Sequence, residues 1–250
     1  MEGSESLRRL IVSSGKALAD LAMPRTCLVC GRPLGTEERH LCIWCAADTP
    51  LTYNWEQPHN PMADEFNAVL ERLRGTGEPE EYAYAASLLY YHHENPYKAI
   101  PQALKYHRDL PAGRFFASCL GSYMASAPHW ADVDVVIPVP LHWLRHWRRG
   151  YNQAEVIAGE LAHGLGAKLR TDVLSRARRT RSQTALSAEE RLRNVASVFS
   201  VRKPLEAKHI LLVDDTFTTG ATLAACRRVL RAALGPSVRI SIATLAVVEA

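Results

Sequence analysis

Apolar runs and helix-like patterns alternate along the second half of the chain. Branched apolar residues dominate 133–140 and 210–213, and each run precedes a stretch with apolar residues three or four positions apart, at 151–165 and from Leu223 onward. Short branched runs are typical of strands buried in a parallel sheet, and the longer spacing is typical of helices. The alternation predicts an α/β protein with a mainly parallel, doubly wound sheet flanked by helices.

The first half of the chain is less regular and predicts a smaller part joined to this sheet. A helix is expected at 64–74, a strand at 82–91, and helices at 97–106 and 114–124. Residues 50–61 contain three prolines and little periodicity, which is typical of a linker. The expected parts are 1–50, a leading amphipathic helix with a cysteine-rich segment, then 51–80, a linker and helix, and finally 81–250, the α/β domain.

Two adjacent acids follow the second apolar run, and a turn rich in threonine and glycine then opens a helix. Backbone N–H groups and hydroxyls at 218–222 can surround a phosphate at the helix N-terminus. Both carboxylates would repel that phosphate, so we expect them to accept hydrogen bonds from vicinal ribose hydroxyls instead. The pattern predicts a sugar-phosphate site made of Asp214, Asp215, Thr216, Thr218, Thr219, Gly220, Ala221 and Thr222.

Two other protein classes place acids after an apolar strand. Response-regulator receivers carry an acid pair after their first strand, whereas Asp214 comes late in this sequence. Haloacid-dehalogenase phosphatases need an Asp-x-Asp spacing, which this segment lacks. A plain strand–turn–helix with polar capping residues is the structural alternative, although capping accounts for only one acid and one threonine.

Four of the six cysteines form two Cys-x-x-Cys pairs, Cys27 with Cys30 and Cys42 with Cys45, separated by eleven residues. Two such pairs can place four thiolates tetrahedrally around one structural Zn²⁺. Disulfides are the alternative, but polar and charged residues interrupt the apolar ones near the N-terminus, which favours an amphipathic helix over an export signal. We therefore expect reduced thiols, one zinc ion and a cytoplasmic protein.

Basic residues concentrate near the expected carboxyl ends of the strands, where open α/β sheets bind ligands. Residues 145–202 hold twelve Lys or Arg against five Asp or Glu, whereas the whole chain has a net charge of +4. This surplus suits a diphosphate, which arginine binds bidentately, and equally a nucleic-acid backbone. A solvated loop is the alternative for Arg148 and Arg149. The polar segment at 176–194 is expected to be a mobile cover. The candidate diphosphate-binding residues are Arg148, Arg149, Arg176 and Arg181.

Together these segments resemble the ComF family, also called ComFC or GntX-like proteins. The resemblance runs from about residue 24 to the C-terminus and implies a zinc finger fused to a type I phosphoribosyltransferase fold. It also implies magnesium-dependent binding of 5-phosphoribosyl 1-diphosphate (PRPP) and, in competence-capable bacteria, a role in handling incoming single-stranded DNA. The motifs that carry it are Cys27-x-x-Cys30 with Cys42-x-x-Cys45, Leu104-Lys105-Tyr106, Ile137-Pro138-Val139-Pro140, residues 148–153, 183–187 with 191–194, and 213–222.

Two functions of different class follow from the resemblance. As an enzyme, the protein would be a phosphoribosyltransferase, a glycosyltransferase whose acceptor no residue of the sequence identifies. As an adaptor, it would bind PRPP or single-stranded DNA without turnover and serve a competence helicase. A salvage-type or amidophosphoribosyltransferase-like enzyme is a further alternative. No stretch approaches the ~20 apolar residues of a membrane span, so no membrane insertion is expected.

Overall fold

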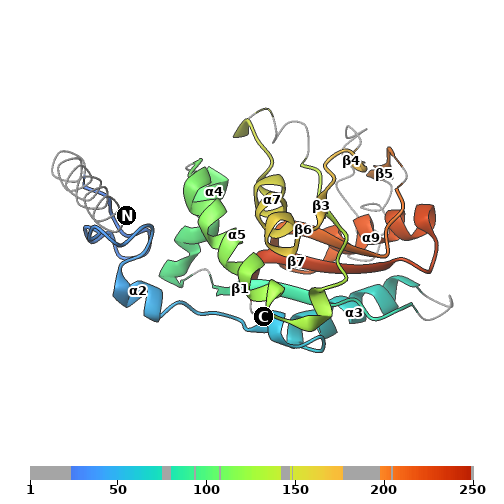
Figure 1. Ribbon diagram of the computed structural model, residues 1–250, viewed down its shortest axis with the longest axis horizontal. Helices are drawn as coiled ribbons and strands as arrows, with labels where there is room; N and C mark the ends of the chain where they lie inside the picture. Colours follow the sequence, from blue (N-terminus) through green and yellow to red (C-terminus); the bar gives the residue numbers. More distant parts are fainter. Residues whose placement is uncertain are drawn as a thin grey trace, which may run out of the picture. The chain divides into compact units, whose positions relative to one another are not determined.

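The computed structural model describes residues 24–74, 80–92, 94–106, 108–141, 147, 149–176, 198–203 and 205–248. The chain divides into two compact units, Met1–Pro50 with His93–Ile100 and Leu51–His92 with Pro101–Ala250. Figure 1 shows their helices and strands. The division into 1–50, 51–80 and 81–250 stays a prediction.

The larger unit is built on a five-stranded sheet with the order β1-β7-β6-β2-β3. Every neighbouring pair of these strands is parallel. The predicted α/β class with a mainly parallel sheet is therefore confirmed. The strands are β1 (Ala85–Tyr91), β2 (Val135–Pro138), β3 (Lys168–Leu169), β6 (His209–Phe217) and β7 (Arg239–Val248).

Helices pack on this sheet in two pairs, α5 with α7 and α3 with α9. Two connections cross the sheet in opposite directions. The one from β2 through α7 leads toward the β3 edge, and the one from β6 through α9 leads toward the β1 edge. Right-handed crossovers then place α7 and α9 on opposite faces. The helices are α3 (Pro61–Arg74), α4 (Ala99–Tyr106), α5 (Leu110–Ala125), α7 (Gln153–Leu165) and α9 (Ala221–Leu234).

The point at which these two connections diverge lies between β6 and β2, at the centre of the sheet. Such a switch point is where open α/β sheets bind ligands, at the carboxyl ends of the strands. A buried core holds the strands in place: Ile210 and Leu212 of β6 belong to one apolar cluster with Phe66 of α3 and Leu223 of α9. The fold therefore presents the ends of β6 and β2 as its candidate site.

The remaining elements are short. A two-stranded antiparallel sheet joins β4 (Leu174–Arg176) to β5 (Phe199–Val201). Residues 177–194 of the expected cover lie outside the described residues. No helix in the described part of the chain has the length and apolar character needed to cross a membrane. The other short helices are α2 (Ile43–Ala47), η1 (Asn54–Glu56), η2 (Pro96–Lys98) and η3 (Pro128–Trp130).

Candidate functional site

Strand β6 does not end at the two acids, as the sequence suggested, but continues through them to Phe217. The cause is pairing with β7, in which Asp214 lies opposite Thr244 and Phe217 opposite Val247. On the other side, β2 pairs with β6 only as far as Val213. Within the described residues, the last part of β6 therefore has a strand on one edge only. The acid pair lies on this projecting part of the central strand.

The carboxyl group of Asp214 is partly shielded from solvent. One of its oxygens, Oδ1, accepts a hydrogen bond from the backbone N–H of Asp215 at 2.8 Å. Burial, reinforced by the neighbouring charge of Asp215, raises the pKa of Asp214 to about 7, although Lys105 and Arg176 act in the opposite direction. At neutral pH this group therefore exchanges between a carboxylate, which only accepts hydrogen bonds, and a carboxylic acid, which also donates.

Asp215 is held differently, by a cation that reaches it from α4. The ammonium group of Lys105 lies 3.1 Å from Asp215 Oδ1 and donates a hydrogen bond to Thr216 Oγ1 at 2.8 Å. Both charged side chains are about four-fifths buried, with exposed fractions of 22% and 20%. The motif Leu104-Lys105-Tyr106 was visible in the sequence, but nothing in its spacing assigned Lys105 to the acid pair.

The turn after β6 leads directly into α9. Gly220 precedes the helix with a left-handed φ of 66°, and it has no side chain to cap the first N–H groups. Thr218 and Thr219 are exposed, and Ala221 and Thr222 are half-buried. A helix N-terminus whose amides lack a side-chain cap is a favourable place for an anion. The turn thus has the donors that a phosphate requires.

Gly220 is confined by space as well as by conformation. A Cβ atom there would lie 3.0 Å from Phe217 and 3.2 Å from Phe66. Gly166, which follows α7, has the same φ of 66° but nothing within 4 Å of the corresponding position. Substitution of Gly166 therefore measures the cost of the left-handed conformation alone, whereas substitution of Gly220 adds the cost of crowding.

Gly220→Ala is expected to lower the free energy of unfolding by ~1–3 kcal/mol, because backbone strain and crowding both oppose it. The matched control Gly166→Ala should lose only the smaller, conformational part. Urea denaturation of both variants measures the difference. Equal losses would show that Phe217 and Phe66 do not confine the turn.

The loop after β2 is tied to the start of α7. The Asn152 side chain accepts a hydrogen bond from Ala154 N–H and donates one to the Val139 carbonyl at 3.0 Å. Arg149 donates to Gln153 Oε1 at 2.9 Å and lies over the exposed ring of Tyr106, 5.6 Å from its centroid. This places one predicted basic residue beside α4, the helix that also carries Lys105.

Of the other three predicted basic residues, the structure describes Arg176. Arg176 lies over the ring of Phe199, 5.1 Å from its centroid, and its charge lowers the pKa of Asp214. It therefore belongs to the surroundings of the acid pair. Arg148 and Arg181 lie outside the described residues, so their assignment to a diphosphate stays a prediction.

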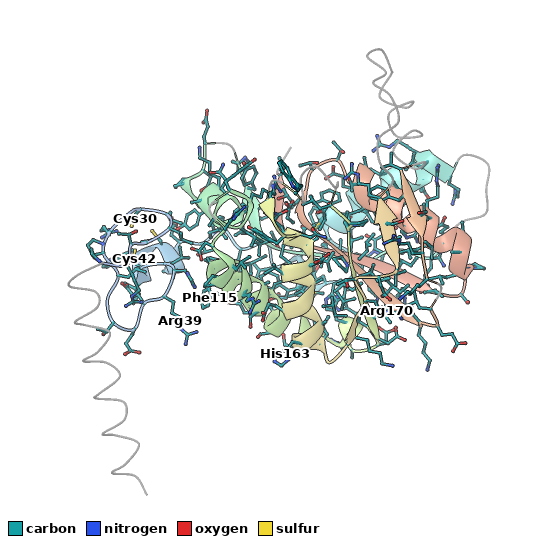
Figure 2. The ribbon with its side chains drawn as sticks, turned by 90° about the horizontal axis from the view of Figure 1, so that it is seen from above. Cys30, Arg39, Cys42, Phe115, His163 and Arg170 are labelled. Atoms are coloured by element: carbon teal, nitrogen blue, oxygen red, sulfur yellow. The ribbon has the colours of Figure 1, made fainter. Side chains whose placement is uncertain are left out.

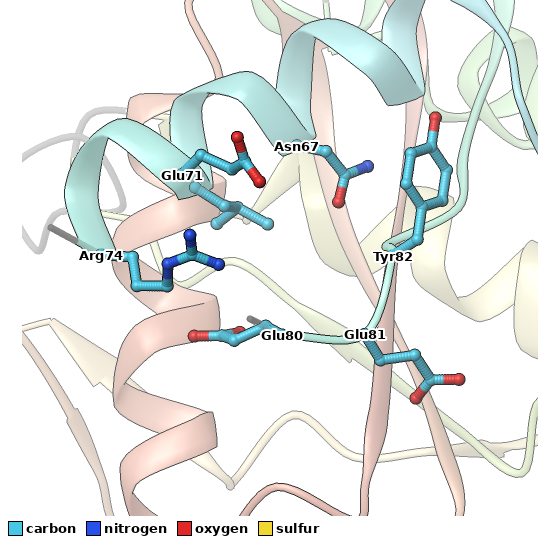
Figure 3. A pocket seen from close by; sticks show the side chains of 7 residues that line it. Asn67, Glu71, Arg74, Glu80, Glu81 and Tyr82 are labelled. Carbon is cyan, nitrogen blue, oxygen red and sulfur yellow. The ribbon is translucent and has the colours of Figure 1, made fainter. Parts of the chain in front are cut away.

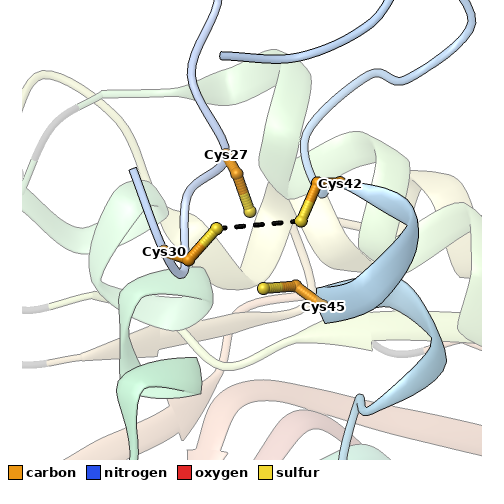
Figure 4. Close-up of side chains that lie close together, drawn as sticks. All are labelled: Cys27, Cys30, Cys42 and Cys45. Atoms are coloured by element: carbon orange, nitrogen blue, oxygen red, sulfur yellow. Dashed lines mark hydrogen bonds between the residues drawn. The ribbon is translucent and has the colours of Figure 1, made fainter. Parts of the chain in front are cut away.

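The four predicted cysteines meet in the smaller unit. Their sulfur atoms all lie within 4.8 Å of one another, and Cys30 Sγ is 3.7 Å from Cys42 Sγ (Figures 2 and 4). Tetrahedral zinc with bonds of ~2.3 Å requires sulfurs roughly 3.8 Å apart. The cluster therefore fits a tetrathiolate zinc site, whereas direct disulfides would need sulfurs ~2.0 Å apart.

Hydrogen bonds hold the two Cys-x-x-Cys segments of this cluster in place. Gly31, with φ of 72°, closes the turn of the first segment by donating its N–H to the Cys27 carbonyl at 2.9 Å. Backbone and side-chain hydrogen bonds from Arg32 lower the pKa of Cys30 to about 6, which favours the thiolate that a metal needs. The later segment of the same unit also takes part, because the Tyr97 hydroxyl donates to the Cys45 carbonyl at 2.8 Å.

A second constellation has the geometry of a hydrolytic triad without its accessibility. His209 Nε2 lies 2.8 Å from Ser241 Oγ, and His209 Nδ1 lies 2.7 Å from Asp132 Oδ1. His209 and Ser241 have no exposed surface, so a substrate cannot reach the hydroxyl. We interpret the network as a buried structural one at the amino ends of β6 and β7.

A small pocket with a volume of about 90 Å³ lies between α3 and residues 80–82 (Figure 3). Its acids are largely committed to neighbouring arginines: Glu80 pairs with Arg227 and Arg231, and Glu81 with Arg239. The lining consists of Asn67, Leu70, Glu71, Arg74, Glu80, Glu81 and Tyr82, which does not include the acid pair of β6. We place no function in it.

Comparison with known proteins supports the resemblance found in the sequence. No family model matches the chain. It is 31% identical over 146 residues to Competence protein F of Haemophilus influenzae, covering 56% of this chain and 64% of that protein. It is 42% identical over 91 residues to DNA utilization protein YhgH of Salmonella typhimurium, and 38% identical over 91 residues to YhgH of Escherichia coli strain K12, each covering 36% of this chain.

The chain spans only 40% of the length of the YhgH proteins that it matches. Among solved structures, a hypoxanthine phosphoribosyltransferase from Staphylococcus aureus aligns with 53% of this chain and 62% of its own, with 15% identity and a TM-score of 0.31. That score carries no argument about the fold, which the parallel strand order establishes. The sequence matches confirm the resemblance to the ComF family: this chain is a homologue of Competence protein F and DNA utilization protein YhgH.

Proposed function

We propose that this protein binds PRPP at the carboxyl end of β6 and acts as a phosphoribosyltransferase-like protein in DNA uptake or processing. The names of its relatives, Competence protein F and DNA utilization protein, support the biological setting. One local feature of the structure supports PRPP as the ligand. An acid pair on the projecting part of β6 is followed within seven residues by the uncapped start of α9.

Each part of the site suits a different part of PRPP. Asp214 and Asp215 accept hydrogen bonds from the ribose hydroxyls, while the amides and hydroxyls of 218–222 hold the 5-phosphate. Arg149 and Arg176, with Arg148 and Arg181, are proposed to stabilise the diphosphate. Mg²⁺ bound to the diphosphate would neutralise its charge, which assists its departure as a leaving group.

A thermal-shift titration tests the proposal. PRPP with Mg²⁺ should raise the melting temperature in proportion to the logarithm of its concentration above Kd, because it binds the folded state alone. Ribose 5-phosphate, which lacks the diphosphate, should stabilise less. A melting temperature that does not respond to PRPP at millimolar concentration would contradict PRPP binding.

Turnover is the second part of the enzyme hypothesis and needs an acceptor. No described side chain near Asp214 identifies one, so release of diphosphate should be measured over bases, ammonia and single-stranded DNA. Release with one acceptor class would make the protein a transferase. PRPP binding without release would favour the adaptor hypothesis, with a helicase as the proposed partner.

Single-stranded DNA is a second candidate ligand, favoured by the basic surplus of 145–202 and by the relatives' names. If arginines of this segment follow a DNA backbone, the logarithm of the binding constant should fall with log salt by ~0.7 per phosphate neutralised. We expect a clear slope and partial competition by PRPP. Fluorescently labelled single-stranded DNA measures it, and a slope of zero would falsify DNA binding through this segment.

A further inference from the structure

We propose that Lys105 is a positioning residue that reserves the acid pair of β6 for a sugar and excludes a divalent cation bound there alone. The inference rests on the proposed function, because the sugar is that of PRPP. Its test nevertheless uses a metal ion without PRPP. The contacts of Lys105 with Asp215 and Thr216 carry it.

The ammonium group of Lys105 occupies the position that a metal bound to Asp215 and Thr216 would need. It lies 3.1 Å from Asp215 Oδ1 and 2.8 Å from Thr216 Oγ1. A carboxylate and a hydroxyl are oxygen ligands of the kind that Mg²⁺ and Mn²⁺ prefer. The ammonium satisfies Asp215 without using the second carboxylate oxygen, Oδ2, which keeps its capacity to accept a hydrogen bond from a ribose hydroxyl.

Lys105 is held in this position by its own helix. It lies in the last turn of α4, where the helix dipole favours a positive charge. The preceding residue, Leu104, is buried, and its carbonyl accepts a hydrogen bond from the Tyr151 hydroxyl. The side chain thus starts from a fixed backbone, and its contacts with Asp215 and Thr216 hold the charge beside the carboxylate.

The chemical consequence is selectivity between two kinds of ligand. A fixed positive charge repels an incoming divalent cation but tolerates a neutral diol. A cation would enter the site only with the diphosphate, whose negative charge compensates for Lys105. The protein would then bind PRPP as its magnesium complex without first binding the metal.

Titration of Mn²⁺ by electron paramagnetic resonance, without PRPP, tests this role in the full chain. Lys105→Met should bind Mn²⁺ at least about tenfold more tightly than the wild type, since it removes one charge a few ångströms away. Lys105→Arg, which keeps the charge, should bind Mn²⁺ as weakly as the wild type. Lys105→Met combined with Asp215→Asn should lose the gained affinity, which assigns the new site to Asp215.

Lys203→Met is the control for removal of a lysine charge, because Lys203 forms an ion pair of similar length, 3.0 Å, with Asp172, in a more exposed place outside the acid pair. It should leave Mn²⁺ binding unchanged. Should Lys105→Met fail to fold, as judged by circular dichroism, Lys105→Gln provides the same comparison. Equal Mn²⁺ affinity of a folded Lys105 variant and the wild type would overturn the inference.

The same variants separate this inference from the proposed function. With saturating Mg²⁺, Lys105→Met should bind PRPP several-fold more weakly than the wild type, whereas Lys105→Arg should retain most of the affinity. If the wild type bound no PRPP, the proposed function would fail, but the Mn²⁺ comparison would still show whether Lys105 guards the acids. If PRPP bound normally and Mn²⁺ binding did not change in Lys105→Met, only the role of Lys105 would fail.

Discussion

Asp214→Asn combined with Asp215→Asn is expected to weaken PRPP binding by at least about 100-fold while the protein stays folded. Hydrogen bonds to charged groups contribute ~1.5–3 kcal/mol each, and the substitution weakens two of them. Calorimetry at saturating Mg²⁺ measures the affinity, and circular dichroism verifies the fold. Asp172→Asn removes an exposed acid from a different ion-paired group and should leave PRPP affinity unchanged.

The pH dependence of stability tests the surroundings of Asp214 independently of PRPP. The pKa of Asp214 is raised to about 7 in the folded protein. Because the pKa of this carboxyl is higher in the folded than in the unfolded protein, the folded state binds more protons between the two pKa values. The free energy of unfolding therefore decreases as the pH rises from ~4 to about 7. Asp214→Asn mimics the protonated form and should therefore stabilise the protein relative to the wild type at pH 8, with a smaller gain at pH 5. Unchanged PRPP affinity in a folded double variant would remove the acids from the site.

The purified protein is expected to contain about one zinc ion per chain, which Cys42→Ser should largely abolish. Four sulfurs at the spacing of tetrahedral zinc support this expectation. Elemental analysis measures the metal. Cys119→Ser, which changes a half-buried cysteine outside the cluster, should leave the zinc content unchanged.

Chelation should have a local effect that hydrogen exchange can map. Residues 24–50 should lose protection, and so should 93–100, because Tyr97 bonds to the Cys45 carbonyl within the same unit. Strands β6 and β7 have their own buried core and should keep their protection. Protein purified without zinc, or disulfides found among these cysteines by mass spectrometry, would contradict the metal site.

Features that depend on local sequence were predictable. The paired Cys-x-x-Cys spacing indicated a four-sulfur cluster, and apolar periodicity indicated the helices α7 and α9 close to their observed positions. Helix α3 starts at Pro61 rather than near residue 64, since the Asn60 side chain accepts a hydrogen bond from Ala63 N–H at its start. A proline in the first turn is compatible with a helix, although it had suggested a linker.

Features that depend on distant contacts were not predictable. The acids looked like the end of a strand because they are polar, but pairing with β7 extends β6 to Phe217. Lys105 reaches Thr216 across 111 positions of sequence, which no spacing rule covers. The return of Tyr97 to the cysteine cluster is likewise long-range, 52 positions from Cys45. The sequence therefore indicated candidate site residues, but not the distant residues that contact them.

The proposed PRPP site lies at the end of β6 and the start of α9. Isothermal titration of PRPP into the wild-type protein, with saturating Mg²⁺ and again with the metal chelated by EDTA, tests it most directly. We expect saturable binding of one PRPP per chain with Mg²⁺ and much weaker binding without it. Absence of saturable heat at millimolar PRPP, in folded protein with its zinc in place, would contradict it.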